Sequence, residues 1–394
     1  MHKIQLKKGR ESSVLRHHPW IFSGAVHKLD GDPSAGDLVK VISMGGAVLG
    51  IGAYSPQSQI RVRLFSFADE VVDNEYLSEA VGRAIDKRKH LANENSRSAY
   101  RLIYGESDGL PGLVVDRYGD FLVCQFLFVG MERCKKVIVE MLAKHTACRG
   151  IYERSDVGVR QKEGLEKIAG PLWGEVPPAE IIIAENELEF AVDVIGGQKT
   201  GFYLDQVDNR GEVQRLSMGK QVLNCFSYTG GFSVAALRGG ADHVTSLDSS
   251  APALKMAGEN VERNGFSWER HELVNGNVFD QLRQYQADHR LFDMVVLDPP
   301  KLAENKSQVN KAARAYKDLA LQAARLLHPG GILVTFSCSG GIDLNLFQKI
   351  TADALLDARC AGEVIRYLHQ SEDHPVALGF PESQYLKGLV CRVF

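Results

Sequence analysis

Four apolar runs in the second half of the sequence decide the fold. They read QVLNCF at 221–226, HVTSLD at 243–248, MVVLD at 294–298 and GILVTF at 331–336. Stretches rich in helix-forming residues separate them. Nearly continuous apolar strands that alternate with helices indicate a parallel sheet covered on both faces. The sequence therefore predicts a Rossmann-like α/β domain over residues 196–394, whose ligands bind beyond the carboxyl ends of the strands.

The first 70 residues have a different pattern. Short strand-like runs at 37–42, 47–52 and 60–64 alternate with turn residues rich in glycine. This alternation is typical of a small β-barrel. Residues 1–66 hold nine Lys and Arg against four Asp and Glu, although the whole chain has a net charge of −3. Such a local excess fits a module that contacts phosphates, and it fits an ordinary solvated face equally well.

Residues 71–195 are expected to form an α+β middle domain. A helix-forming stretch covers 75–95, and the strand-like runs 113–116 and 121–126 flank the turn Tyr118-Gly119-Asp120, which predicts a β-hairpin. The other predicted elements are a helix around 131–144 and strands near 150–153 and 188–193. The sequence thus predicts three domains, at residues 1–70, 71–195 and 196–394.

Composition excludes several classes of protein. Of the 394 residues, 44% are hydrophobic and 24% are charged, which is ordinary for a globular chain. No apolar run is long enough to cross a bilayer, and the first eight residues lack the apolar core of a signal peptide, so we expect a cytoplasmic protein without membrane contact. Seven scattered cysteines form neither a metal-binding pair nor a disulfide framework, so no metal is expected.

The turn after the first apolar run carries the signs of a cofactor pocket. It reads NCFSYTGGF at 224–232, and Gly230 there lets backbone approach a ligand. The second run ends in Asp248, where a carboxylate can accept hydrogen bonds from the ribose of an adenosine-containing cofactor. A dehydrogenase would share that carboxylate. However, it should also show the G-x-G-x-x-G pattern that places a pyrophosphate on a helix N-terminus, and this turn does not.

S-adenosylmethionine fits the same turn, because it has no phosphate to bind. Between the second and third of the four runs, after Leu273 and Val274, the sequence turns with NGNVF at 275–279. Methyltransferases of this type often place Asp at the position of Asn277 to bond the adenine amino group. The amide oxygen of Asn277 can still accept that bond. We therefore expect S-adenosylmethionine as the cofactor.

The ends of the last two runs indicate the reaction. The motif DPPK at 298–301 has the shape of the motif of amino-methylating enzymes, but Lys301 replaces the aromatic residue that would stack on the target base. The next run ends in FSCSG at 336–340, which places Cys338 beside Asp298. A thiolate that adds to C6 of a pyrimidine makes C5 nucleophilic. Cys338 is thus the expected nucleophile, and Asp298 the group that holds the base at N3.

Six motifs together carry a family resemblance. They are KTGFYLDQ (199–206), NCFSYTGGF (224–232), DPPK (298–301), FSCSG (336–340), RHHPWIFSGA (16–25) and GESDGLPG (105–112). The combination resembles the bacterial ribosomal RNA large subunit methyltransferase I family over the whole chain. The resemblance implies an N-terminal PUA domain, a middle α+β domain and a methyltransferase domain that makes 5-methylcytosine in 23S ribosomal RNA. It also implies that residues 199–206 line the cofactor.

The predicted site residues follow from the motifs and the resemblance together. Cys338 and Asp298 are the expected catalytic residues. The expected cofactor-binding residues are Asp205, Gln206, Asn224, Phe226, Ser227, Tyr228, Gly230, Asp248, Ser249, Asn277 and Asp298. The expected RNA-binding residues are Lys7, Lys8, Arg10, Arg16, His18 and Trp20. For Trp20, core packing is the alternative to base stacking.

Two other functions stay open. Another group of RNA cytosine-C5 enzymes carries a cysteine where this chain has Pro300. This leaves Cys338 as the single candidate thiol, a feature that resembles uracil-C5 enzymes, so uracil is an alternative target. A catalytically inactive RNA-binding protein is the second alternative, against which the presence of Cys338 and Asp298 argues. The sequence is compatible with a homo-oligomer and does not determine one.

Overall fold

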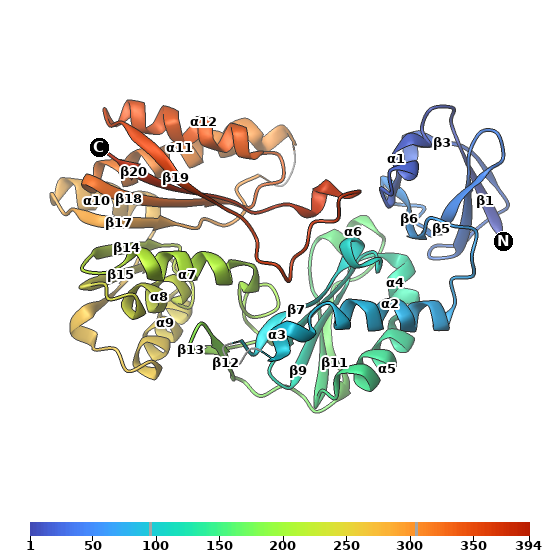
Figure 1. Cartoon of the computed structure of the whole chain (residues 1–394), viewed down its shortest axis with the longest axis horizontal. Coiled ribbons are helices and arrows are strands. Elements are labelled where there is room, and N and C mark those ends of the chain that lie inside the picture. Colours follow the sequence, from blue (N-terminus) through green and yellow to red (C-terminus); the bar gives the residue numbers. More distant parts are fainter. Residues whose placement is uncertain (94–96, 304–305) are drawn as a thin grey trace. The chain divides into compact units, whose positions relative to one another are not determined.

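The computed structural model describes residues 1–93, 97–303 and 306–394 (Figure 1). The described chain divides into two compact units. Unit 1 comprises Met1–Ile183, Val192–Leu204 and Glu372–Ser383; unit 2 comprises Ala184–Ala191, Asp205–Ser371 and Gln384–Phe394. The units do not test the predicted domain bounds at 1–70, 71–195 and 196–394, which stay a prediction. No helix within the described residues is long and apolar enough to cross a membrane.

The N-terminal part of unit 1 is a six-stranded sheet. Its strands are β1 (His2–Leu6), β2 (Trp20–Phe22), β3 (Val26–Asp30), β4 (Leu38–Ile42), β5 (Val48–Tyr54) and β6 (Ile60–Ser66), in the order β2-β6-β5-β4-β1-β3. The short helix α1 (Ser12–Leu15) follows β1. Alternation along β4 buries Val39 and Val41, which pack with Ile4 and Leu6 in one apolar core. The predicted period-2 pattern thus has its physical basis in this core.

A second sheet in unit 1 has five strands. They are β7 (Ala99–Tyr104), β8 (Leu113–Tyr118), β9 (Phe121–Phe126), β10 (Gly150–Ser155) and β11 (Ile168–Gly174), in the order β11-β10-β9-β8-β7. Tyr118 pairs with Phe121 across the turn, which confirms the predicted hairpin. The helices are α2 (Asn74–Asp86), α3 (Lys89–Asn93), α4 (Val129–Arg133), α5 (Lys135–Thr146) and α6 (Val159–Lys162). This sheet and its helices give the predicted α+β fold.

Two helices that the sequence predicts as single elements are interrupted. The stretch 75–95 forms α2 and α3, and its residues 94 and 95 lie outside the described residues. Between the two helices Arg88 turns inward, where its guanidinium donates to Asp108 Oδ1 at 2.8 Å. The stretch around 131–144 forms α4 and α5, which meet at Cys134. Helical composition alone carries no signal for the buried arginine that interrupts the first pair.

Unit 2 is built on a seven-stranded sheet. Its strands are β14 (Gln221–Cys225), β15 (His243–Asp248), β16 (His271–Asn275), β17 (Phe292–Leu297), β18 (Leu327–Ser337), β19 (Gly362–Leu368) and β20 (Lys387–Val393), in the order β16-β15-β14-β17-β18-β20-β19. The first five in this order are parallel, and β20 runs antiparallel to both neighbours. A separate two-stranded sheet pairs β12 (Ile181–Glu185) with β13 (Leu188–Val192).

Helices cover both faces of this sheet. They are α7 (Val207–Leu216), α8 (Gly231–Arg238), α9 (Ala251–Arg263), α10 (Val278–Ala287), α11 (Val309–Arg325) and α12 (Leu344–Asp357). Helices α8 and α9 pack on β15, whereas α11 packs on β17 and β18 and α12 on β20; Figure 1 shows the two groups on opposite sides. The predicted Rossmann-like fold is confirmed. The strand order reverses between β14 and β17, so a ligand crevice is expected at their carboxyl ends.

Candidate active site

The loop after β14 has a strained backbone. Phe226 and Tyr228 have positive φ angles of 58° and 48°, and Gly230 has φ 83°. Residues other than glycine rarely adopt positive φ angles, and such backbone strain is concentrated at binding and catalytic sites. A Cβ atom on Gly230 would lie 2.9 Å from the Cβ of Ala257. The loop therefore follows a tight path that only glycine permits at position 230.

Three buried polar atoms around this loop have no partner within the described residues. They are Asn224 Oδ1, Ser227 Oγ and Thr229 Oγ1. The other end of the Asn224 amide is engaged, because its Nδ2 donates to Ser233 Oγ at 2.8 Å. Buried polar groups are almost always hydrogen-bonded in native proteins. These three atoms are therefore available to a polar ligand.

The Asp248 carboxylate is held at the end of β15 by backbone donors. Its Oδ2 accepts from the Tyr228 N–H at 2.9 Å and its Oδ1 from the Ser250 N–H at 2.8 Å. Each oxygen keeps further acceptor capacity, as two ribose hydroxyls require. Ser249, beside it, is exposed. The geometry fits the predicted ribose contact and joins Asp248 directly to the strained loop.

Asn277 has a structural task as well as its predicted one. It is the N-cap of α10, and its Oδ1 accepts from the N–H groups of Phe279 at 2.9 Å and Asp280 at 3.4 Å. The same oxygen is the predicted acceptor for the adenine amino group. Capping engages the acceptor and leaves the Nδ2 donors to a ligand. The adenine contact of Asn277 stays a prediction, with this competing role beside it.

Asp298 follows β17 and forms part of a chain of side-chain hydrogen bonds. Gln206 Nε2 donates to Asp298 Oδ2 at 3.0 Å, and Asn209 Nδ2 donates to Gln206 Oε1 at 2.5 Å. Asn209 Nδ2 also donates to the carbonyl of His369 at 3.1 Å. These bonds fix which way the Gln206 amide faces. Its NH₂ group must point at Asp298, because its oxygen is engaged by Asn209.

The protonation of Asp298 is perturbed. Burial raises its pKa to about 7, with a further contribution from the negative charge of Asp205 and an opposing one from the Gln206 hydrogen bond. Asp205 accepts a hydrogen bond from the Tyr385 hydroxyl. Asp298 therefore exchanges a proton near neutral pH, as a group that assists a charge change on a base must do.

Cys338 lies at the same edge of the sheet as Asp298. Strands β17 and β18 are parallel neighbours, with Leu297 paired to Thr335, so both residues follow the carboxyl ends of adjacent strands. Cys338 is half-buried, whereas four other cysteines are buried: Cys124, Cys148, Cys225 and Cys391. Burial raises the pKa of Cys391 to about 12. That buried thiol stays protonated near neutral pH, whereas Cys338 is partly exposed and follows the carboxyl end of β18.

Comparisons with known proteins agree with this geometry. A PUA-like domain model matches residues 4–67, and an S-adenosylmethionine-dependent methyltransferase model matches residues 147–388. The ribosomal RNA large subunit methyltransferase I of Shewanella denitrificans is 49% identical over 394 residues, covering 100% of this chain and 99% of that protein. The protein of the same name from Pseudoalteromonas translucida is 49% identical over 392 residues, covering 99% of each. This chain belongs to the ribosomal RNA large subunit methyltransferase I family.

A solved structure supports both the fold and the cofactor of this family member. A candidate methyltransferase complexed with SAH matches with a TM-score of 0.88 and 25% identity, covering 100% of both chains. S-adenosylmethionine is thus the cofactor. The site fits it, because the unpartnered buried atoms of Asn224, Ser227 and Thr229 and the carboxylate of Asp248 are groups that a polar cofactor can satisfy. The individual cofactor contacts of these residues stay predictions.

The segment 199–206 is divided between the two units. Thr200, buried in unit 1, donates to Asp116 Oδ2 at 2.6 Å, and the Phe202 N–H donates to the Tyr118 hydroxyl at 3.1 Å. Asp205 and Gln206 belong to unit 2 with Asp298. The first half of the motif thus has a packing role in unit 1. Within unit 2 only its last two residues contact the site.

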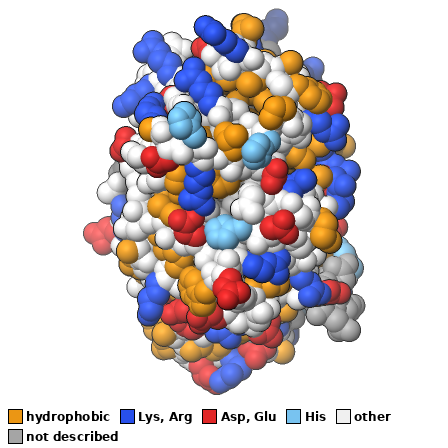
Figure 2. Space-filling view, turned by 90° about the vertical axis from the view of Figure 1, so that its left-hand side faces the viewer, with side chains coloured by type: hydrophobic (Ala, Val, Ile, Leu, Met, Phe, Trp, Pro, Cys, Tyr) orange, Lys and Arg blue, Asp and Glu red, His pale blue; other side chains and the backbone are white. Residues whose placement is uncertain are grey.

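The predicted RNA-binding residues lie in the N-terminal sheet region of unit 1. Lys7, Lys8, Arg10 and Arg16 are exposed, and the Lys7 ammonium donates to the carbonyl of Gly24. In Figure 2, which turns the left-hand side of Figure 1 toward the viewer, both signs of charge mix over the surface. That face belongs to unit 2 and not to the N-terminal sheet region, so the RNA contacts of these residues stay predictions.

Trp20 and His18 are tied into unit 1. Trp20 Nε1 donates to Glu106 Oε1 at 2.7 Å, and its ring lies 4.7 Å from that of Phe380 and 6.0 Å from that of His18. His18 Nε2 lies 3.2 Å from Glu382 Oε2. The indole N–H is thus already engaged. This arrangement favours core packing over base stacking for Trp20.

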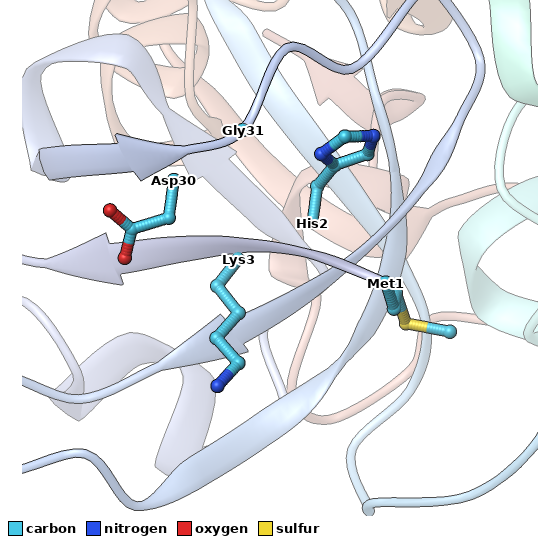
Figure 3. Close-up of a pocket in the computed structure, with 5 residues that line it drawn as sticks. All are labelled: Met1, His2, Lys3, Asp30 and Gly31. Atoms are coloured by element: carbon cyan, nitrogen blue, oxygen red, sulfur yellow. The ribbon is translucent and has the colours of Figure 1, made fainter.

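A pocket of about 460 Å³ opens elsewhere, on the N-terminal sheet, lined by Met1, His2, Lys3, Asp30 and Gly31. Figure 3 shows that Lys3 and Asp30 point one way whereas His2 and Met1 point away from them. The side chains do not converge on one point, and none belongs to a predicted site. Within the described residues no group of three His, Cys, Asp or Glu is arranged to hold a metal ion.

Sequence reasoning missed several residues of the site. Tyr385 bonds Asp205, Asn209 orients Gln206, and Lys387 lies beside the end of β18. A signal for Lys387 was present: the stretch KGLVCRV at 387–393 reads as a buried strand that begins with a charge. Tyr385 and Asn209 carry no comparable signal, since only the fold brings them to the site.

Proposed function

We propose that this chain methylates C5 of a specific cytosine in 23S ribosomal RNA, with Cys338 as the nucleophile. The names of its relatives supply the substrate class, since both are large-subunit ribosomal RNA methyltransferases. One observation supports the reaction type. The half-buried thiol of Cys338 and the carboxyl group of Asp298, whose pKa is about 7, follow the carboxyl ends of the adjacent strands β18 and β17. The same proposal places the protein in the cytoplasm, where bacterial ribosomes assemble.

The chemistry assigns a separate task to each residue. The Cys338 thiolate forms a bond to C6, and the electron pair of the C5–C6 double bond makes C5 nucleophilic. Bound S-adenosylmethionine supplies an electrophilic methyl group. Loss of the C5 proton to a base re-forms the double bond and expels Cys338 as thiolate. Asp298 holds the base edge throughout.

The protonation of Asp298 favours cytosine over uracil. Cytosine N3 is an acceptor, so it needs a donor, and a protonated Asp298 can donate to it and neutralise charge that builds up on the ring. Uracil N3 carries hydrogen and needs an acceptor instead. Gln206 engages Oδ2 of Asp298, which leaves Oδ1 to carry the proton. Uracil-C5 methylation is the second candidate, because it uses the same Cys338 chemistry.

Methyl transfer from labelled S-adenosylmethionine to unmodified 23S RNA, with nucleoside identification, tests this proposal. Wild type should yield 5-methylcytosine, and Cys338→Ala should lose transfer by at least about a thousandfold, because covalent activation of C5 disappears. Cys360→Ala, a matched change at a partly exposed cysteine on another loop, should keep wild-type transfer. Labelled 5-methyluridine would identify uracil as the target, and full activity in Cys338→Ala would exclude the thiol mechanism.

A further inference from the structure

Lys387 is a buried cation next to the carboxyl end of β18, the strand that Cys338 follows. It is the first residue of β20 and pairs with Ser337, the residue before Cys338. Only 7% of its surface is exposed. Lysine is almost never buried to this extent unless hydrogen bonds or an opposite charge compensate for the lost hydration. Its position therefore needs a physical explanation.

The Lys387 ammonium is only partly satisfied by its neighbours. Two of its three N–H donors reach carbonyl oxygens, that of Ser339 at 2.9 Å and that of Tyr385 at 2.7 Å. Within the described part of the chain, no carboxylate lies at salt-bridge distance from Nζ. The third donor is left for another anion or acceptor. The ammonium thus bonds the backbone of Ser339, the residue that directly follows Cys338.

The charges around Lys387 single out Cys338. Burial lowers the pKa of Lys387 to about 8, the negative charges of Cys338 and Asp343 oppose this change, and the positive charge of Lys301 adds to it. The side chain still carries its proton at pH 7. Asp343 is exposed and caps helix α12 through Leu346 N, so it is solvated and already engaged. The thiolate of Cys338 is thus the anion that the buried ammonium can stabilise most.

We propose that Lys387 is a positioning residue that stabilises the thiolate form of Cys338 and keeps it ready for attack on C6. This inference rests on the proposed function only for the role of that thiolate in methyl transfer. The thiol proton leaves to solvent before the substrate base arrives, and the ammonium compensates the charge that remains. A positive charge next to a cysteine is the usual means of lowering its pKa into the neutral range.

The loop that carries Cys338 has a second anchor, which separates charge from structure. Ser339 Oγ accepts from the Ala303 N–H at 3.1 Å and lies 3.1 Å from the hydroxyl of Tyr316. These contacts do not involve Lys387. Removing the ammonium should therefore change the charge at Cys338 while the loop stays anchored through the Ser339 side chain.

Alkylation of Cys338 in the full-length protein tests the inference. Iodoacetamide is applied between pH 5 and 10, and peptide mass spectrometry follows Cys338 and Cys360 separately. In wild type, Cys338 should reach half-maximal reactivity at a lower pH than Cys360. In Lys387→Met that midpoint should rise by at least about one unit, with about a tenfold lower rate at pH 7, because the opposite charge is lost. Lys387→Arg should keep a low midpoint.

Two outcomes would overturn the proposal. One is an unchanged Cys338 midpoint in folded Lys387→Met. The other, which needs no variant, is a wild-type Cys338 that reacts over the same pH range as Cys360. Neither measurement involves methyl transfer. If Cys338→Ala keeps its methylation activity, the proposed function fails while the alkylation result stands, so the two failures are distinguishable.

Discussion

Buried aspartates have different partners in the five-stranded sheet of unit 1 and at the carboxyl ends of the parallel strands of unit 2. In unit 1, Asp116 is fully buried, and both of its oxygens accept from the Arg101 guanidinium, at 2.8 and 2.9 Å. In unit 2, Asp298 bonds to the neutral amide of Gln206, and within the described residues it forms no salt bridge. A buried acid with a cationic partner is a structural group. One without such a partner keeps its proton near neutral pH and is available for chemistry.

The largest effect is expected from Asp298→Asn. The amide keeps the shape of the side chain but cannot give or take a proton, so methyl transfer should fall about 100- to 10,000-fold. Folding should be preserved, because no ionic partner is left uncompensated. The measurement is the single-turnover rate of methyl transfer to unmodified 23S RNA.

Asp293→Asn is the matched control for that change. Asp293 lies near the start of β17, the strand that Asp298 follows, and it accepts from the Gln221 N–H at 2.8 Å. An asparagine oxygen can still accept that bond, so transfer should stay at the wild-type rate. Equal losses in both variants would contradict a specific role for Asp298.

The same substitution in unit 1, Asp116→Asn, should act on stability instead. It removes the fully buried negative charge to which the partly buried Arg101 guanidinium donates, and it disturbs the bond from Thr200 at 2.6 Å. We expect a loss of about 3 kcal/mol in the free energy of unfolding of the region, seen as a lower thermal midpoint. Below that midpoint, methyl transfer should be as in wild type. If Asp116→Asn lowered methyl transfer without lowering stability, Asp116 would not be a purely structural group, and the proposed difference between Asp116 and Asp298 would be contradicted.

A smaller effect is expected in the pH dependence of stability. The pKa of Asp298 is about 7 in the folded protein, above the ordinary value of about 3.9. Between these values the folded state holds a proton that the unfolded chain releases, so this contribution is complete below about pH 4 and is lost as pH rises through 7. The thermal midpoint of Asp298→Asn relative to wild type should therefore be higher at pH 8 than at pH 5. An equal difference at both pH values would mean that Asp298 titrates normally.

The sequence allowed the site's strand-end residues to be predicted because their positions are local. A strand followed by a turn places Asp248, Asp298 and Cys338 at one sheet edge as soon as the strands are known to be parallel. It could not show that Gln206 bonds Asp298, since these residues lie far apart in sequence and only the fold joins them. Lys387 illustrates both cases. The sequence shows its charge at the start of an apolar strand. It does not show that this strand pairs with the end of β18, next to Cys338.

Other differences arise from competition between local and tertiary effects. The helix expected over 75–95 is interrupted where Arg88 turns inward to Asp108, a residue to which sequence reasoning gave no role. The oxygen of Asn277 that was assigned to adenine caps a helix. Both cases concern a polar side chain whose hydrogen-bond partner is not apparent from the sequence pattern. The partner was missing, because it is set by packing.

The central claim, a covalent bond from Cys338 to the substrate base, is tested most directly by trapping. RNA in which 5-fluorocytidine replaces cytidine, incubated with S-adenosylmethionine, should form a complex with wild type that survives denaturation. The fluorine at C5 cannot leave as a proton does, so the double bond cannot re-form and Cys338 is not expelled. Peptide mapping should locate the adduct on Cys338, and Cys338→Ala should form none. A wild-type protein that methylates normal RNA but never yields this complex would contradict the account.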